Sequence, residues 1–169
     1  GEVFAKLKAK GLDKNTVVIF TSDNGPHEEG GADPEFFGRD GKLKGLKRQC
    51  YEGGIRIPFI AWWPKHIKAG VVNDTQFAFY DLMPTFCDLA GIKNFAKRYT
   101  NKRLAGEGFD GISIAPTLLG SDAEQKHHEY LYWEFHETDQ IGMRKGDWKL
   151  VVEKGEPRLY NLATDIHED

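Results

Sequence analysis

The sequence predicts an α/β protein that ends in a small antiparallel β sheet. Two apolar runs, residues 16–21 and 57–63, are typical of strands that are covered on both faces. A segment with helical spacing follows them at residues 80–90. From about residue 129, short aromatic runs alternate with glycines, which indicates an antiparallel meander.

The first half of the chain alternates between predicted regular elements and a long loop. Residues 2–10 have apolar side chains at helical spacing, and Gly11 is a plausible helix end. The run at residues 16–21 follows directly, as in half of a βαβ unit. Residues 22–56 are rich in glycine and charge, and loops of that length are often functional. Pro64 closes the second strand, which we expect at residues 57–63.

The second half contains one more predicted helix and the meander. In residues 80–90, Pro84 lies early and Gly91 follows the end, as is usual for helices. We place a domain boundary near residue 120, giving residues 1–120 and 121–169. The meander strands are expected at residues 129–135, 140–144, 148–153 and 158–162.

Composition excludes several classes of protein. The chain has 169 residues and a formal net charge of −3, which disfavours a general nucleic-acid binder. It has no run of 18 apolar residues, so we expect no membrane span, and these residues contain no secretory leader. The only two cysteines, Cys50 and Cys87, cannot form a disulfide framework, and we expect both to be packing residues. The pair His127–His128 is expected in a solvated loop.

The first candidate site follows the strand at residues 16–21. Asp23 and Asn24 offer a carboxylate and an amide oxygen, which suit a hard cation such as Ca²⁺ or Mg²⁺. The same residues, followed by Gly25 and Pro26, are also good turn sequence. Local chemistry leaves both interpretations open and favours the turn.

The second candidate site is a basic segment, residues 42–48, followed by residues 51–56. Four cations within seven residues can meet an anion or form a solvated face. Gly53–Gly54 permits close backbone approach or a positive φ. Glu52 and Arg56 are placed to pair and brace the loop.

Together these blocks resemble the sulfatase family of the alkaline phosphatase superfamily. The resemblance rests on VVIFTSDNGPHEEGG, LKGLKRQCYEGGIRIPFIAWWP, DLMPT, DGIS, RKGDWKL and LYNL, in the order of the C-terminal part of an arylsulfatase-type enzyme. It implies the C-terminal portion of an alkaline-phosphatase-like mixed sheet flanked by helices, followed by the small antiparallel sheet.

The resemblance also implies roles for particular residues. Asp23 and Asn24 match ligands of a divalent ion, usually Ca²⁺, and Lys47 matches a sulfate-contacting lysine. His27 is a weaker candidate to face the ester. Glu134 and His136 are possible specificity residues, although a solvent-facing strand end is the simpler interpretation.

The expected function is that of a sulfatase fragment. The family's formylglycine nucleophile is made from a Cys/Ser-x-Pro-x-Arg motif, which this chain lacks, so the isolated chain is expected to be inactive. The implied partner is a sulfated small molecule or glycan, and family analogy points to a periplasmic, secreted or lysosomal location. Two alternatives stay open: a phosphoesterase or phosphoethanolamine-transferase relative, and a non-catalytic module that binds an anionic glycan through Lys42, Lys44, Lys47 and Arg48.

Overall fold

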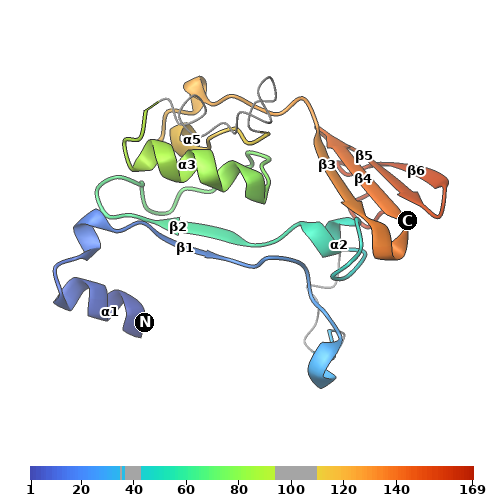
Figure 1. Ribbon diagram of the computed structural model, residues 1–169, viewed down its shortest axis with the longest axis horizontal. Helices are drawn as coiled ribbons and strands as arrows, with labels where there is room; N and C mark the ends of the chain where they lie inside the picture. The colour runs from blue at the N-terminus through green and yellow to red at the C-terminus, as the bar shows by residue number, and fades with distance from the viewer. Residues whose placement is uncertain (35, 37–42, 94–109) are drawn as a thin grey trace, which may run out of the picture. The chain divides into compact units, whose positions relative to one another are not determined.

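The computed structural model describes residues 1–34, 36, 43–93 and 110–169, and Figure 1 shows its elements. The chain forms two compact units, one built from residues 1–19 and 61–128 and the other from residues 20–60 and 129–169. The helices are α1 (Glu2–Ala9), α2 (Glu52–Ile55), α3 (Leu82–Leu89) and α5 (Ala115–Leu119), with short 3₁₀ turns at Asp13–Asn15, Glu29–Gly31, Phe79–Asp81, Asp122–Glu124 and His136–Thr138. The strands are β1 (Val18–Thr21), β2 (Phe59–Trp62), β3 (Leu131–Phe135), β4 (Gln140–Lys145), β5 (Trp148–Glu153) and β6 (Glu156–Asn161).

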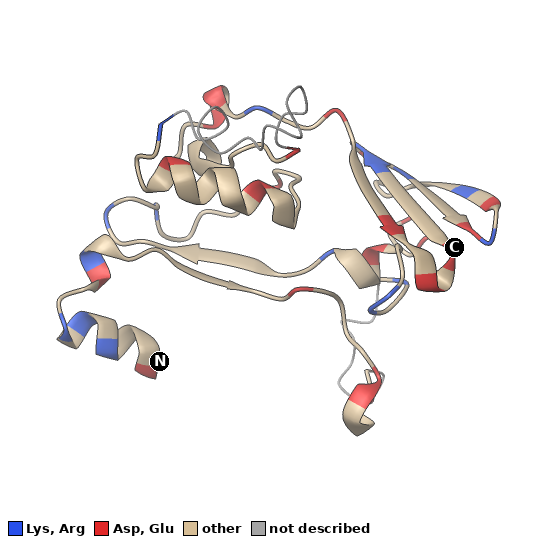
Figure 2. Cartoon of the chain, in the orientation of Figure 1, with Lys and Arg blue, Asp and Glu red and all other residues tan. Residues whose placement is uncertain are grey.

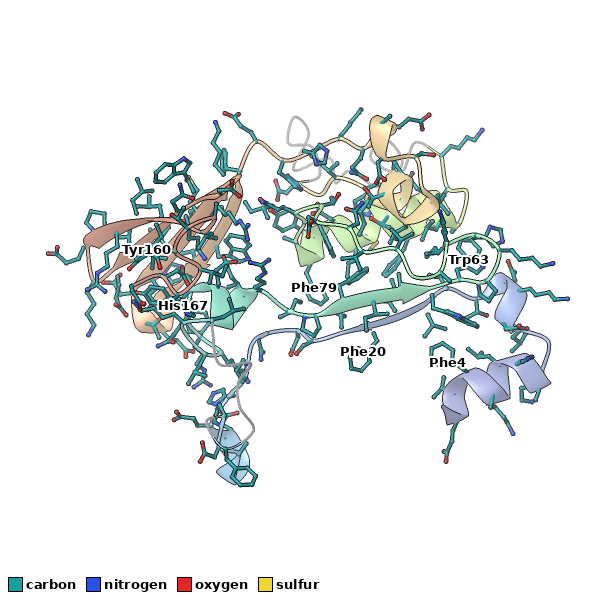
Figure 3. The ribbon with its side chains drawn as sticks, turned by 180° about the vertical axis from the view of Figure 1, so that it is seen from behind. Phe4, Phe20, Trp63, Phe79, Tyr160 and His167 are labelled. Carbon is teal, nitrogen blue, oxygen red and sulfur yellow. The ribbon has the colours of Figure 1, made fainter. Side chains whose placement is uncertain are left out.

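The first unit begins with helix α1, which confirms the helix expected at residues 2–10. Gly11 has a φ of 66° just after the helix ends, a conformation that glycine adopts without strain. The ring of Phe4 packs edge-on against Trp62 at 4.7 Å, and the indole of Trp63 donates a hydrogen bond to the carbonyl of Lys14 at 3.1 Å. These contacts hold α1 and the turn after it against β2 and Trp63. Figure 3 labels Phe4 and Trp63.

The buried carboxylate of Asp81 connects three segments of the first unit through hydrogen bonds. It accepts hydrogen bonds from the backbone N–H groups of Ala78 at 2.8 Å and Ile112 at 2.7 Å. Its Oδ1 also lies 2.8 Å from Nε2 of His128, whose side chain is only 14% exposed. The expectation that His128 lies in a solvated loop was therefore wrong. A fully buried carboxylate needs several polar partners, and His128 supplies one of them.

Strands β1 and β2 form a two-stranded sheet (Figure 1). The hydroxyl of Thr21 donates to the carbonyl of Pro58 at 2.8 Å, so the end of β1 lies beside the start of β2. Both strands were expected to be buried on both faces, but Phe20 is 66% and Ile60 is 61% exposed. Figure 3 shows the Phe20 ring projecting from the strand pair. Strand side chains project from the faces of a sheet, and the described residues leave these two side chains uncovered.

The second unit contains the predicted meander, and its strands run antiparallel in the order β3-β4-β5-β6. Alternate residues of β4 and β5 are buried. Val151 and Tyr160 pack there with Tyr51 and Leu162 to form the core of this unit. The sequence analysis missed two short helices, α2 and α5. Both have only four or five residues, too few to show a helical period.

Cys50 and Cys87 are buried and unpaired, as expected. Burial raises the pKa of the Cys50 thiol, so this thiol is less readily ionised than an exposed one. The Cys50 side chain packs over Gly142, where an added Cβ would lie 2.9 Å from the Cys50 Cβ. The glycine in β4 therefore makes room for the loop that carries Cys50. No helix in the described part of the chain is long and apolar enough to cross a membrane.

Candidate anion and cation site

The candidate cation ligands lie in a tight turn directly after β1. The Ser22 hydroxyl donates to the carbonyl of Asn24 at 2.8 Å, and the Asn24 side-chain nitrogen donates to the carbonyl of Gly25 at 2.8 Å. The Asp23 side chain is exposed. The turn favoured by local chemistry is therefore present. It uses the amide nitrogen of Asn24, whereas a hard cation would take the amide oxygen.

Three glycines bring this turn against the basic loop. The N–H of Gly25 donates to the carbonyl of Gly54 at 2.9 Å. A Cβ added at Gly25 would overlap the Gly53 carbonyl oxygen and lie 2.8 Å from the carbonyl carbon of Gly53. The side-chain-free residues Gly53 and Gly54 likewise face backbone carbonyls of residues 43–49. Neither has a positive φ, so the pair serves close backbone approach, one of the two roles that the sequence left open.

Lys47 is joined to the same turn through its backbone. Its N–H donates to the carbonyl of Pro26 at 2.9 Å, and its Nζ lies 3.8 Å from a carboxylate oxygen of Glu29. Arg48 also faces Glu29, at 3.5 Å, and adopts a φ of 73°, which is rare for a residue with a side chain. The predicted anion-binding lysine and the predicted cation ligands therefore lie on adjoining loops of one unit.

His27 is the third group that faces the Glu29 carboxylate. Its Nδ1 accepts a hydrogen bond from the Glu29 N–H at 3.0 Å, so the proton of the neutral ring lies on Nε2. Nε2 is 3.6 Å from the Glu29 carboxylate and, among the described residues, is buried without a hydrogen-bond partner. Lys47, Arg48 and His27 thus surround one carboxylate, and this arrangement can hold another oxyanion in its place.

Glu134 and His136 lie together at the end of β3. His136 Nδ1 is 3.5 Å from the Glu134 carboxylate, and the Tyr132 hydroxyl donates to the other Glu134 oxygen at 2.9 Å. This hydrogen bond raises the pKa of Tyr132. The His136 side chain is 89% exposed. The following Thr138 hydroxyl donates to the carbonyl of Arg48 at 2.9 Å, so the β3–β4 turn contacts the loop that carries Lys47.

Asp23 and Asn24 fit a hard cation in chemical kind but not in number. Ca²⁺ takes roughly six to eight oxygen ligands, whereas this turn offers two such side chains. In the ranges that the structure describes, no group of three or more His, Cys, Asp or Glu side chains is placed to hold a metal ion. Lys42, the fourth cation of the proposed glycan-binding face, lies outside the described residues.

The sequence analysis missed a buried charge cluster made by Glu52, Arg144 and Lys149. Figure 2 colours the charged residues along the chain. The predicted Glu52–Arg56 pair forms, at 3.5 Å, but Glu52 has closer partners. Its two oxygens lie 2.8 Å from Lys149 and 2.9 Å from Arg144. One signal was available: strand alternation places Lys149 on the same face as Val151.

Comparison with known proteins assigns the family. Residues 1–92 match the Sulfatase family. The mouse N-acetylgalactosamine-6-sulfatase is 38% identical over 125 residues, which cover 70% of this chain and 21% of the mouse protein. The N-acetylgalactosamine-6-O-sulfatase of Bacteroides thetaiotaomicron is 30% identical over 190 residues, which cover 99% of this chain and 35% of that protein. The chain belongs to the sulfatase family, which confirms the resemblance seen in the sequence.

A solved structure supports the fold class. The crystal structure of the PsFucS1 sulfatase from Pseudoalteromonas sp. matches 99% of this chain and 35% of its own, with a TM-score of 0.76 and 30% identity. The expected sulfatase fold, with helices and a terminal antiparallel sheet, is therefore confirmed. The chain spans about a fifth to a third of the length of these relatives.

Proposed function

We propose that these 169 residues are the C-terminal part of a sulfatase that hydrolyses the sulfate ester of a glycan or small molecule. The observation that supports this most directly is the hydrogen bond from Lys47 N–H to the Pro26 carbonyl. It joins the candidate sulfate-binding loop to the candidate cation turn. The exposed Phe20 and Ile60 also fit a sheet whose faces are covered by further residues of a longer protein.

In this proposal Lys47 holds a sulfate oxygen and stabilises the negative charge that grows as the ester bond breaks. Fixed cations act in this way without reorganising during the reaction. Lys47 Nζ already faces a carboxylate in the structure, so it is oriented toward an anion before substrate binds. His27 Nε2–H is placed to donate a further hydrogen bond to the same group.

Asp23 and Asn24 would supply a carboxylate and an amide oxygen to a Ca²⁺ or Mg²⁺ ion. Such an ion polarises an ester oxygen and balances charge. The remaining ligands and the formylglycine nucleophile would come from residues outside this chain. We therefore expect no turnover by the isolated chain and only weak Ca²⁺ binding. Clear single-turnover sulfate release by the 169 residues alone would contradict this.

The test compares Lys47→Met with Lys145→Met in the complete polypeptide that contains these residues, using 4-nitrophenyl sulfate as substrate. Lys145 is an exposed lysine of the same unit, paired with Glu129 at 3.0 Å, and serves as the matched control. We expect Lys47→Met to lower kcat/KM by about 10²–10³, the usual effect of losing one oxyanion donor. The control should stay within about twofold of wild type.

Substrate choice tests the two alternatives. A phosphoesterase relative would hydrolyse 4-nitrophenyl phosphate faster than the sulfate ester. A non-catalytic module would turn over neither ester but would bind a sulfated glycan in a salt-sensitive way. That binding would be lost when Lys42, Lys44, Lys47 and Arg48 are neutralised together.

The proposed partner is a sulfated molecule, and the proposed location is periplasmic, secreted or lysosomal. Glu134 and His136 are proposed to contact the part of the substrate beyond the sulfate. If they do, His136→Ala should change the preference between two sulfated glycans and leave 4-nitrophenyl sulfate hydrolysis unchanged.

A further inference from the structure

Glu52 is held by its side chain and its backbone at the same time. Its carboxylate contacts Lys149 Nζ at 2.8 Å and an Arg144 nitrogen at 2.9 Å, and its backbone N–H donates to Glu168 Oε2 at 2.7 Å. Glu52, Lys149 and Glu168 are each at most 1% exposed. The β4–β5 hairpin therefore holds the side chain of Glu52, and Glu168 holds its backbone.

Stability is a weak explanation for burying these charges together. Buried ion pairs are expensive to desolvate, and apolar residues of similar size often stabilise a protein as well or better. The cluster also holds strain: Glu168 has a φ of 55° although it carries a side chain. Burial raises the pKa of Glu168, and its Oε1, 3.5 Å from Lys149, has no hydrogen-bond partner among the described residues. Retained strain of this kind is common near functional sites.

The two residues that follow Glu52, Gly53 and Gly54, form hydrogen bonds with both loops of the candidate site. The N–H of Gly53 donates to the carbonyl of Lys44 at 2.7 Å, and the carbonyl of Gly54 accepts the N–H of Gly25 at 2.9 Å. Glu168 also holds Lys44, because the Lys44 Nζ donates a hydrogen bond to the Glu168 carbonyl at 2.6 Å. A shift of α2 would therefore move the turn that contains Gly25 and the loop that leads to Lys47.

We infer that the buried cluster of Glu52, Lys149 and Glu168 positions both loops of the anion and cation site. This inference rests on the proposed function for what the site binds. None of the three is offered as a catalytic residue, because each acts through α2 and the backbone of the two loops.

The first test measures how often the linking hydrogen bonds of the two loops open, without any ligand. Amide hydrogen exchange is followed by NMR in the 169-residue chain at Gly25, Lys47 and Gly53, whose N–H groups make the three linking hydrogen bonds. We expect Lys149→Met to speed exchange at these amides at least tenfold, while amides between β5 and β6 stay within twofold.

A matched exposed pair provides the control. Glu129 and Lys145 lie 3.0 Å apart in the same unit, but their side chains are 77% and 66% exposed. Lys145→Met removes the same charge from the same sheet, and it should leave all three amides unchanged. Equal exchange in Lys149→Met and Lys145→Met would overturn the inference.

A double variant keeps the test decisive if Lys149→Met unfolds the whole unit. Lys149→Met with Glu168→Gln removes one charge of each sign and leaves the Glu52–Arg144 pair intact. The amide oxygen of the new Gln can still accept the Glu52 N–H. We expect exchange at the three amides to be slower than in Lys149→Met but still faster than in wild type. A double variant that folds and exchanges at the wild-type rate would show that Lys149 does not position the loops.

The second test uses 4-nitrophenyl sulfate and the complete polypeptide. A positioning role predicts a fall in kcat of at least tenfold for Lys149→Met, with partial rescue in the double variant and unchanged values for Lys145→Met. If the wild-type polypeptide hydrolyses no sulfate ester, the proposed function fails, and the amide measurements still decide whether the cluster positions the loops. If the wild type is active and Lys149→Met keeps wild-type kcat, the positioning inference fails alone.

Discussion

Replacing Gly25 by alanine is the sharpest test of how the two loops of the candidate site are joined. Gly25 has no positive φ, so an alanine there meets no backbone strain, only a steric conflict. The new Cβ would overlap the carbonyl oxygen of Gly53 and lie 2.9 Å from the Cα of Gly54. Both obstacles are backbone atoms, which cannot rotate away as a side-chain tip could.

The expected cost follows from the distances. Ordinary contact for a Cβ begins near 3.4 Å, and the Gly53 carbonyl oxygen lies far inside that distance, so the two backbones must separate by more than about 1 Å. Overpacking of this kind costs about 1–3 kcal/mol, and the strained Gly25–Gly54 hydrogen bond adds about 0.5–1.5 kcal/mol. We therefore expect Gly25→Ala to destabilise the second unit by roughly 2–4 kcal/mol.

The assay is urea denaturation of the 169-residue chain, followed by the NMR amide signals of β3–β6, together with amide exchange at Lys47. Gly30→Ala is the control: Gly30 has a φ of 70° but no atom within 4 Å of its added Cβ. It should cost about 1 kcal/mol of conformational strain and leave the Lys47 amide unchanged. A Gly25→Ala chain with wild-type stability and wild-type exchange at Lys47 would refute the argument that glycine packing joins the loops.

Three further predictions address other contacts. Asp81→Ala should lower the free energy of unfolding of the first unit by about 3 kcal/mol or more, because it leaves buried backbone donors unpaired; the exposed Asp88→Ala is the control in the same urea titration. Burial and the nearby Glu153 raise the pKa of Tyr51 to about 12, so the unfolded chain loses its proton first as pH rises. Stability should fall between pH 10 and 12 by up to about 2–3 kcal/mol, and parallel stability curves for wild type and Tyr51→Phe would contradict this. Glu29→Gln removes the carboxylate that Lys47 and Arg48 now face, so inorganic sulfate should bind a few times more tightly in an NMR titration; unchanged affinity would mean that this carboxylate does not compete with the anion.

Patterns that depend on neighbouring residues predicted the structure well. The helix at residues 2–10, the helix at residues 80–90 and the four strands of the meander all form, with ends shifted by one or two residues. These elements follow from periodicity and from the glycines between them, which act locally. The domain boundary near residue 120 stays a prediction. So do the metal and substrate roles of Asp23, Asn24, Lys47 and His27.

Burial could not be predicted in the same way, because it depends on what a segment packs against. The apolar run that ends with Phe20 was expected to be covered, yet Phe20 is largely exposed. Lys149 is fully buried although lysine is among the residues least often found inside. Its partner Glu52 lies 97 positions away in the chain, and no local pattern connects the two. The same holds for His128 and Asp81, which are 47 positions apart.

The way in which the two loops are joined has a consequence for their side chains. The loops are linked by backbone hydrogen bonds and backbone contacts of Gly25, Gly53, Gly54 and Lys47. The buried carboxylate of Glu52, paired with Lys149, anchors the helix that carries two of these glycines. Lys47 takes part in this link through its N–H alone, and its Nζ faces the exposed Glu29 carboxylate at 3.8 Å, which another anion can replace. A site built in this way can keep its shape while the residues that face the ligand change. We therefore expect substitutions of exposed side chains in these loops to alter ligand preference at little cost in stability, and substitutions of the glycines to do the reverse.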